Sequence, residues 1–74
     1  MKPAAERFVL AGEHVELNQL LKLAGLCASG GAGKALVASG AVRVDGQVEL
    51  RKTCKIRAGQ VVEVEGQRIE VVAA

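Results

Sequence analysis

The chain has 74 residues, half of them apolar, and a formal net charge of +2. That length predicts one small domain, residues 1–74, with no room for a second. Phe8 is the only aromatic residue, so we expect an aliphatic core. No apolar stretch approaches the roughly 20 residues that cross a bilayer, and no signal-peptide block follows the first residues. These features predict a soluble cytoplasmic protein that does not enter membranes.

The N-terminal half predicts one strand and two helices. The apolar run 8–10 is expected to be a strand. Apolar residues then recur at the i, i+3, i+4, i+7 spacing of a helical stripe over 17–24, and Gly25 is a natural stop. Ser29 as N-cap and Gly40 as C-terminal glycine bound the second helix. The residues expected on its buried face are Ala32, Ala35 and Leu36.

The following segment changes to a two-residue period, which is typical of strands. We expect residues 42–44 and 48–50 to form a hairpin. Facing apolar residues on its inner side require an odd-numbered turn, most simply at 45–47. The pairs expected from this register are Val44 with Val48, Val42 with Leu50, and Arg43 with Glu49.

A second hairpin is predicted at the C-terminal end, joining 61–64 to 69–72 through a turn at 65–68. Its outer face carries Glu63 and Glu70, so we expect this face to repel polyanions. The element order β-α-α-β-β-β-β predicts an α+β fold in which two packed helices lie against a small antiparallel sheet.

Basic residues are concentrated in the middle of the chain. Between Lys22 and Arg57, seven basic residues stand against two acids, a net charge of +5, whereas the remainder carries −3. This asymmetry favours a polyanion-binding face, the alternative being an ordinary solvated charged surface. The basic residues of this segment are Lys22, Lys34, Arg43, Arg51, Lys52, Lys55 and Arg57.

The second helix begins with the run Ser29-Gly30-Gly31-Ala32-Gly33-Lys34. Glycine is about 1 kcal/mol worse than alanine inside a helix, so three in one turn need a reason. Side-chain-free amides at a helix N-terminus let phosphate oxygens approach, and the Lys34 ammonium can reach the same place. The alternative is that the glycines only allow a tight helix–helix turn. A nucleotide-binding P-loop is excluded, because Ala28 and Ala35 replace residues that the motif requires.

Other chemistries find little support. The two cysteines, Cys27 and Cys54, are too few for a disulfide-stapled fold, and with His14 they make a poor zinc site. We therefore expect free thiols, no metal and no cofactor. One histidine leaves no Cys/His or Ser/His/Asp constellation, so no enzyme is predicted. Because no aromatic residue is available to stack on bases, nucleic-acid binding is expected to depend on phosphate and ribose contacts.

Five segments, in their order and spacing, carry a resemblance to a known family: Leu17-Asn18-Gln19-Leu20-Leu21-Lys22, Gly25-Leu26, Ser29-Gly30-Gly31-x-x-Lys34, Gly40-Ala41-Val42-Arg43-Val44-Asp45-Gly46, and Glu49-x-Arg51-Lys52-x-x-Lys55-Ile56. Residues 8–72 resemble the S-four, or alpha-L, RNA-binding domain, and in particular the small stand-alone bacterial S-four-like RNA-binding proteins. The chain departs from the usual residues of these proteins at Gly30, Gly33, Asp45 and Thr53.

The resemblance implies that the two helices and the hairpin turn after them form an RNA-binding surface. We expect a non-catalytic, monomeric protein that recognises structured RNA, ribosomal or transfer RNA, mainly through phosphates, in association with the ribosome. The alternative is a small protein-interaction module of the translation or ribosome-associated machinery. Arg57 lies beyond the matched motif and is included on charge alone. The expected RNA-binding residues are Lys22, Ser29, Gly30, Gly31, Lys34, Arg43, Arg51, Lys52, Lys55 and Arg57.

Overall fold

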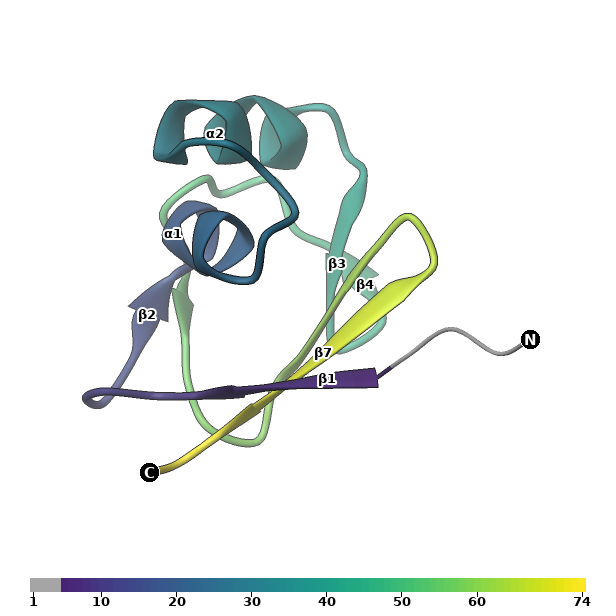
Figure 1. Ribbon diagram of the computed structural model, residues 1–74. Coiled ribbons are helices and arrows are strands. Elements are labelled where there is room, and N and C mark those ends of the chain that lie inside the picture. Colours follow the sequence, from purple (N-terminus) through teal and green to yellow (C-terminus); the bar gives the residue numbers. More distant parts are fainter. Residues whose placement is uncertain (1–4) are drawn as a thin grey trace.

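The computed structural model describes residues 5–74 (Figure 1), so residues 1–4 of the expected domain lie outside the described part. The helices are α1 (Leu17–Leu23) and α2 (Gly30–Ala38), and the strands are β1 (Ala5–Val9), β2 (Val15–Glu16), β3 (Val42–Val44), β4 (Gln47–Val48), β5 (Lys55–Ile56), β6 (Val61–Val64) and β7 (Gln67–Val72). The N-terminal strand, both helices and both hairpins confirm the expected elements. The short pair β2 and β5 was not predicted.

The main sheet has five strands in the order β1-β7-β6-β3-β4. Its neighbours are antiparallel except that β1 runs parallel to β7, with Phe8 opposite Val71. The expectation of a purely antiparallel sheet was therefore wrong, and the α+β fold has a mixed sheet. A two-residue period indicates a strand but not the direction in which it runs. Because β1 and β7 are far apart in the chain, no hairpin turn fixes their relative direction either. The separate pair β2 and β5 is antiparallel.

The first hairpin has a two-residue turn where three residues were expected. Asp45 and Gly46 have φ angles of 52° and 85°, the primed turn whose twist matches that of the flanking strands. Val44 therefore pairs with Gln47, and Arg43 pairs with Val48. The predicted Val44–Val48 pairing was wrong by one residue. This shift turns Val48 to the outer face, where it is 50% exposed.

The second hairpin also closes with two residues, Glu65 and Gly66, at φ angles of 50° and 83°. The expected four-residue turn was therefore wrong. The observed register differs from the expected one by two residues, and a shift of two keeps each side chain on the same face, so the buried and exposed faces are as predicted. Glu63 now lies opposite Arg68 instead of Glu70. The outer face of the sheet therefore alternates acidic and basic residues.

The helices pack side by side on one face of the main sheet (Figure 1). The stripe of α1 is buried as predicted. On α2 the buried residues are Gly33 and Val37, with Leu36 half-buried, whereas Ala32 and Ala35 are exposed, contrary to the prediction. Gly33 and Val37 are four residues apart, one above the other on the helix face that meets α1. The core consists of Leu10, Leu17, Leu20, Leu21, Val37, Val42, Val44, Ile56, Val62, Val64, Ile69 and Val71.

Candidate functional site

The second helix opens with N–H groups that meet no acceptor in the described part of the chain. Its N-cap, Ser29, accepts through Oγ from the N–H of Ala32 at 3.1 Å and through its carbonyl from Gly33. Within residues 5–74, no group accepts from the N–H of Gly30 or Gly31. The N-terminal end of a helix carries a partial positive charge. This end of α2 therefore offers two backbone donors to an anion.

The three glycines of this first turn have different surroundings. A Cβ built at Gly33 would lie 2.6 Å from the carbonyl oxygen of Asn18, so glycine is what lets α2 approach α1 this closely. A Cβ at Gly30 would meet the flexible amide of Gln19 at 3.0 Å. A Cβ at Gly31 would meet only the capping hydroxyl, at 3.8 Å. Helix packing therefore explains Gly33, whereas Gly31 leaves the helix end open to a ligand.

Asn18 joins the start of α2 to the basic segment, which we define as residues 51–57. Its N–H donates to the carbonyl of Lys52 at 3.1 Å, while the N–H of Leu17 donates to the carbonyl of Cys54 at 2.9 Å. The first amides of α1 are thus satisfied by the main chain of the basic segment. Because the opposite side of Asn18 lies against Gly33, the start of α2 and the basic segment meet at the start of α1.

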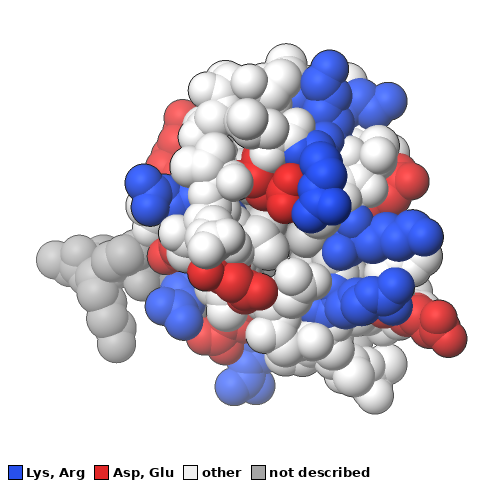
Figure 2. All heavy atoms as spheres, turned by 180° about the vertical axis from the view of Figure 1, so that it is seen from behind, with Lys and Arg blue, Asp and Glu red and all other residues white. Residues whose placement is uncertain are grey.

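The cations of the basic segment all point into solvent. Pairing of β5 with β2 anchors the segment, with Lys55 opposite Glu16. The four side chains Arg51, Lys52, Lys55 and Arg57 are exposed. Figure 2 shows Lys and Arg side chains gathered along one side of the molecule, which is the side where Figure 1 places α1, β2 and the start of α2. Ser29, Gly30, Gly31 and Lys34 belong to the start of α2, and Arg51, Lys52, Lys55 and Arg57 belong to the basic segment, so eight of the ten predicted residues lie on the two elements that meet at Asn18.

Glu49 forms an ion pair within this surface. Its two carboxylate oxygens accept from Nε and Nη2 of Arg51 at 2.9 and 3.0 Å, and Oε2 also accepts from the Arg51 backbone N–H at 3.0 Å. These hydrogen bonds lower the pKa of Glu49 to about 2, so it is ionised at neutral pH. The predicted pairing of Glu49 with Arg43 was wrong, because the shorter turn moves the register by one residue.

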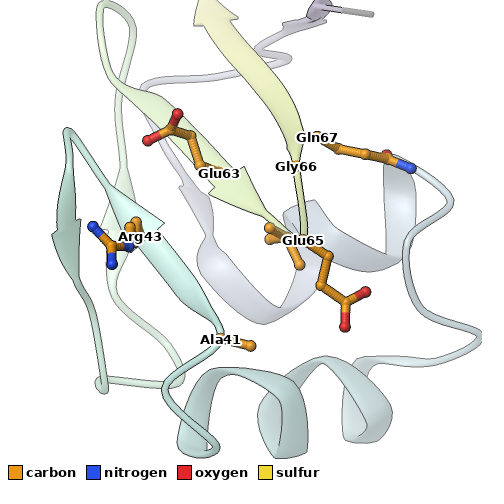
Figure 3. Close-up of a pocket in the computed structure, with 7 residues that line it drawn as sticks. Ala41, Arg43, Glu63, Glu65, Gly66 and Gln67 are labelled. Atoms are coloured by element: carbon orange, nitrogen blue, oxygen red, sulfur yellow. The ribbon is translucent and has the colours of Figure 1, made fainter. Parts of the chain in front are cut away.

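Two predicted residues lie apart from this group. Arg43 alternates with the buried Val42 and Val44 and so points to the outer face of the sheet, opposite the helices. There it lies across from Glu63 and lines a hollow of about 310 Å³ with residues of the second hairpin turn (Figure 3). Lys22 is exposed in the last turn of α1, one turn beyond Asn18, where a cation also complements the helix dipole.

Sequence reasoning gave no role to Asn18 or to the carboxylate of Glu49. Asn18 is 1% exposed and its Oδ1 has no hydrogen-bond partner among the described residues. Asparagine beside an apolar stripe is usually exposed, so nothing in the pattern indicated this burial. Glu49 could have been found, because residues two apart on an extended chain share a side, which places it next to Arg51.

The cysteines, the possible metal ligands and the lengths of the helices also bear on the sequence predictions. Cys27 and Cys54 are free and half-buried, and burial raises the pKa of the Cys54 thiol. In the described part of the chain, no three His, Cys, Asp or Glu side chains come together as metal ligands would. Neither helix described here has the length and apolar character of a bilayer-crossing segment.

Comparison with known proteins identifies the family. The S4 domain family model matches residues 8–72. YbcJ of Escherichia coli strain K12 is 55% identical over 60 residues, which cover 81% of this chain and 86% of YbcJ, and YbcJ of Shigella flexneri gives the same values. The chain therefore belongs to the S4 domain family, which confirms the resemblance seen in the sequence.

A solved structure agrees with this assignment. The solution structure of YbcJ from E. coli matches with a TM-score of 0.68 and 46% identity, covering 99% of this chain and 91% of that one. That structure is described as an alpha-L motif involved in RNA binding. The match confirms the α+β fold with its two packed helices.

Proposed function

We propose that this protein binds structured RNA, ribosomal or transfer RNA, through its phosphates and without catalysis. The observation that carries this proposal is the meeting of the open N-terminus of α2 with the basic segment at Asn18. Membership of the S4 domain family and the likeness to the RNA-binding motif of YbcJ support RNA as the polyanion. Folded RNA holds its phosphates in fixed arrays, which suit a surface of fixed amides and cations.

In this mechanism, the N–H groups of Gly30 and Gly31 donate to one phosphate, and Lys34 adds a charge nearby. Arg51 and Lys52 grip the neighbouring backbone, Arg51 as a planar fork and Lys52 as a point charge. Base stacking plays little part, because Phe8 is half-buried against the core. Shape and phosphate spacing therefore select the RNA.

A protein-interaction module is less well supported. Among residues 5–74, the exposed large apolar side chains belong to β1, α1 and the region around β4, and they are Val9, Leu23, Val48 and Leu50. A docking face for a partner protein normally gathers such residues into one patch. In contrast, most of the Lys and Arg residues visible in Figure 2 lie towards one side of the molecule.

A salt titration of binding tests the proposal. Fluorescence anisotropy would compare a labelled RNA hairpin with duplex DNA of the same length. If about four to six phosphates are neutralised, log affinity should fall with log salt at a slope of roughly 3 to 5. The double variant Arg51→Ala/Lys52→Ala should lose about two units of slope.

The matched control, Arg7→Ala/Arg68→Ala, removes two cations from the outer face of the sheet. It should change the slope by less than half as much as the double variant. Weak binding that is indifferent to salt, or equal losses in the two double variants, would contradict the proposal. A pull-down for a protein partner would then be the next experiment.

A further inference from the structure

Arg51 is hydrogen-bonded through two guanidinium nitrogens to Glu49, although its side chain is 77% exposed. Both carboxylate oxygens of Glu49 contact the guanidinium, through Nε at 2.9 Å and Nη2 at 3.0 Å. A free arginine side chain at such a position would sample many rotamers, and binding a ligand would require ordering it. The pair therefore removes, before any ligand arrives, the conformational freedom that Arg51 would otherwise lose.

The geometry of the pair leaves the guanidinium able to bind a second anion. Arginine has five N–H donors, and Glu49 uses one on Nε and one on Nη2. The two N–H groups of Nη1 and the second one of Nη2 remain. These lie along the end of the guanidinium, which is a fork that matches two oxygens of a phosphate. Glu49 and a phosphate can therefore contact Arg51 at the same time.

Glu49 is itself fixed from several directions. Its side chain is 16% exposed, and besides the guanidinium it accepts from the backbone N–H of Arg51 at 3.0 Å. The thiol of Cys54 lies 3.7 Å from Oε1 and donates to it. Burial raises the pKa of this thiol, so it keeps its proton at neutral pH. The carboxylate is thus a fixed support for Arg51.

Arg51 and Cys54, the two residues that contact Glu49, line a hollow of about 420 Å³ together with Thr53 and Lys55. Two of its lining residues are cations, and Thr53 adds a hydroxyl that can donate to an oxygen. We propose that Glu49 is a positioning residue, which holds Arg51 so that its free edge binds one RNA phosphate at this hollow. This inference rests on the proposed RNA binding.

The proposal makes an unusual prediction, since removing an acid normally strengthens binding of a polyanion. If Glu49 only repelled phosphate, Glu49→Ala would bind RNA about two-fold more tightly at physiological salt. If it positions Arg51, the same change should weaken binding by about two- to five-fold, because a rotamer-rich side chain must then be ordered on binding. The direction of the effect separates the two roles.

The experiment measures RNA-hairpin affinity by anisotropy for wild type, Glu49→Ala, Arg51→Ala and the double variant. Glu16→Ala is the matched control, because Glu16 is an exposed acid opposite Lys55 on the same surface. We expect Glu16→Ala to tighten binding and Glu49→Ala to weaken it. In the Arg51→Ala background, adding Glu49→Ala should instead tighten binding, because only the repulsion of an unpaired carboxylate is left to remove.

The binding of wild type and of Glu49→Ala separates a failure of the proposed function from a failure of the positioning role. If wild type does not bind RNA, the proposed function fails and the role of Glu49 fails with it. If wild type binds and Glu49→Ala binds equally or more tightly, the positioning role alone is overturned.

Far-UV circular dichroism checks that each variant is folded. Should Glu49→Ala not fold, Glu49→Gln replaces it, because its amide oxygen still accepts from Arg51, and it should bind with intermediate affinity. NMR exchange of the Arg51 Nε–H should be slow in wild type and fast in Glu49→Ala.

Discussion

The α-carbon of Gly33 faces the backbone of Asn18 so closely that an added Cβ would lie 2.6 Å from the Asn18 carbonyl oxygen. This contact sets the separation of the two helices, and through Asn18 it also sets the position of the basic segment. A backbone carbonyl cannot move aside as a flexible side chain can. The substitution Gly33→Ala must therefore push the helices apart.

We expect Gly33→Ala to lower the free energy of unfolding by about 2–3 kcal/mol. Urea unfolding followed by far-UV circular dichroism measures this change. The matched control is Gly31→Ala, where a Cβ would make only an ordinary van der Waals contact with the Ser29 hydroxyl, at 3.8 Å, and should stabilise the protein by about 0.4–1 kcal/mol. Equal stabilities for the two variants would show that the helices tolerate a wider separation.

Acid should weaken the fold through Glu49. Hydrogen bonds from the side chain and backbone of Arg51 lower the pKa of Glu49 from 4.5 to about 2 in the folded protein. Because the folded pKa lies below the unfolded one, the stabilisation is complete above about pH 4.5 and is lost as the pH falls towards 2. Arg51 is largely exposed, so we expect a contribution of about 1 kcal/mol or less.

The measurement is the urea midpoint of wild type and Glu49→Gln between pH 7 and pH 2.5. The wild-type advantage over Glu49→Gln should shrink across the acidic part of this range. Parallel curves for wild type and Glu49→Gln would mean that the ion pair contributes nothing to stability.

Asp45 has a structural role in the first hairpin turn. It adopts a φ of 52°, which asparagine and aspartate tolerate better than most residues, and its Oδ1 accepts from the N–H of Val61 at 3.0 Å. Asp45→Ala should destabilise the protein by about 1–2 kcal/mol, because alanine tolerates the positive φ less well and has no side-chain acceptor for the Val61 N–H. Asp45→Asn keeps an acceptor and should stay within about 0.5 kcal/mol of wild type. Thermal unfolding distinguishes these values, and a stable Asp45→Ala would exclude the role.

Lys34 and Arg43 should differ in their contribution to RNA binding. Lys34 projects from the first turns of α2, beside the free amides, whereas Arg43 lies across from Glu63 on the opposite face of the sheet. Lys34→Ala should reduce the salt slope by about one unit, and Arg43→Ala by less than half of that. Anisotropy titrations over a salt series test both variants. A larger loss for Arg43→Ala would place the interface on the sheet.

Much of the fold could be predicted because its signals are local. The leucine stripe of α1, the Ser29 cap of α2 and the alternating valines each depend on residues within a few positions of one another. The identity of each buried face also survived the wrong turn in the second hairpin, because a shift of two residues preserves parity. Similarly, most of the candidate cations came from a single segment of the sequence.

The failed predictions had two causes, one local to a turn and one between strands far apart in the chain. The length of the first hairpin turn decides whether Val48 faces inward. The positive φ angles of Asp45 and Gly46 make this turn two residues long, which places Val48 on the outer face. The parallel direction of β1 depends on its pairing with the distant β7.

The sequence by itself determined the type and order of the elements, the aliphatic core and the concentration of positive charge, because periodicity and composition are properties of the chain. Only the tertiary structure decided that Gly33 is needed for packing and that Asn18 is buried between α2 and the basic segment. Each of these depends on which distant backbone and side-chain groups come within contact distance, and that is set by the packing of the whole core.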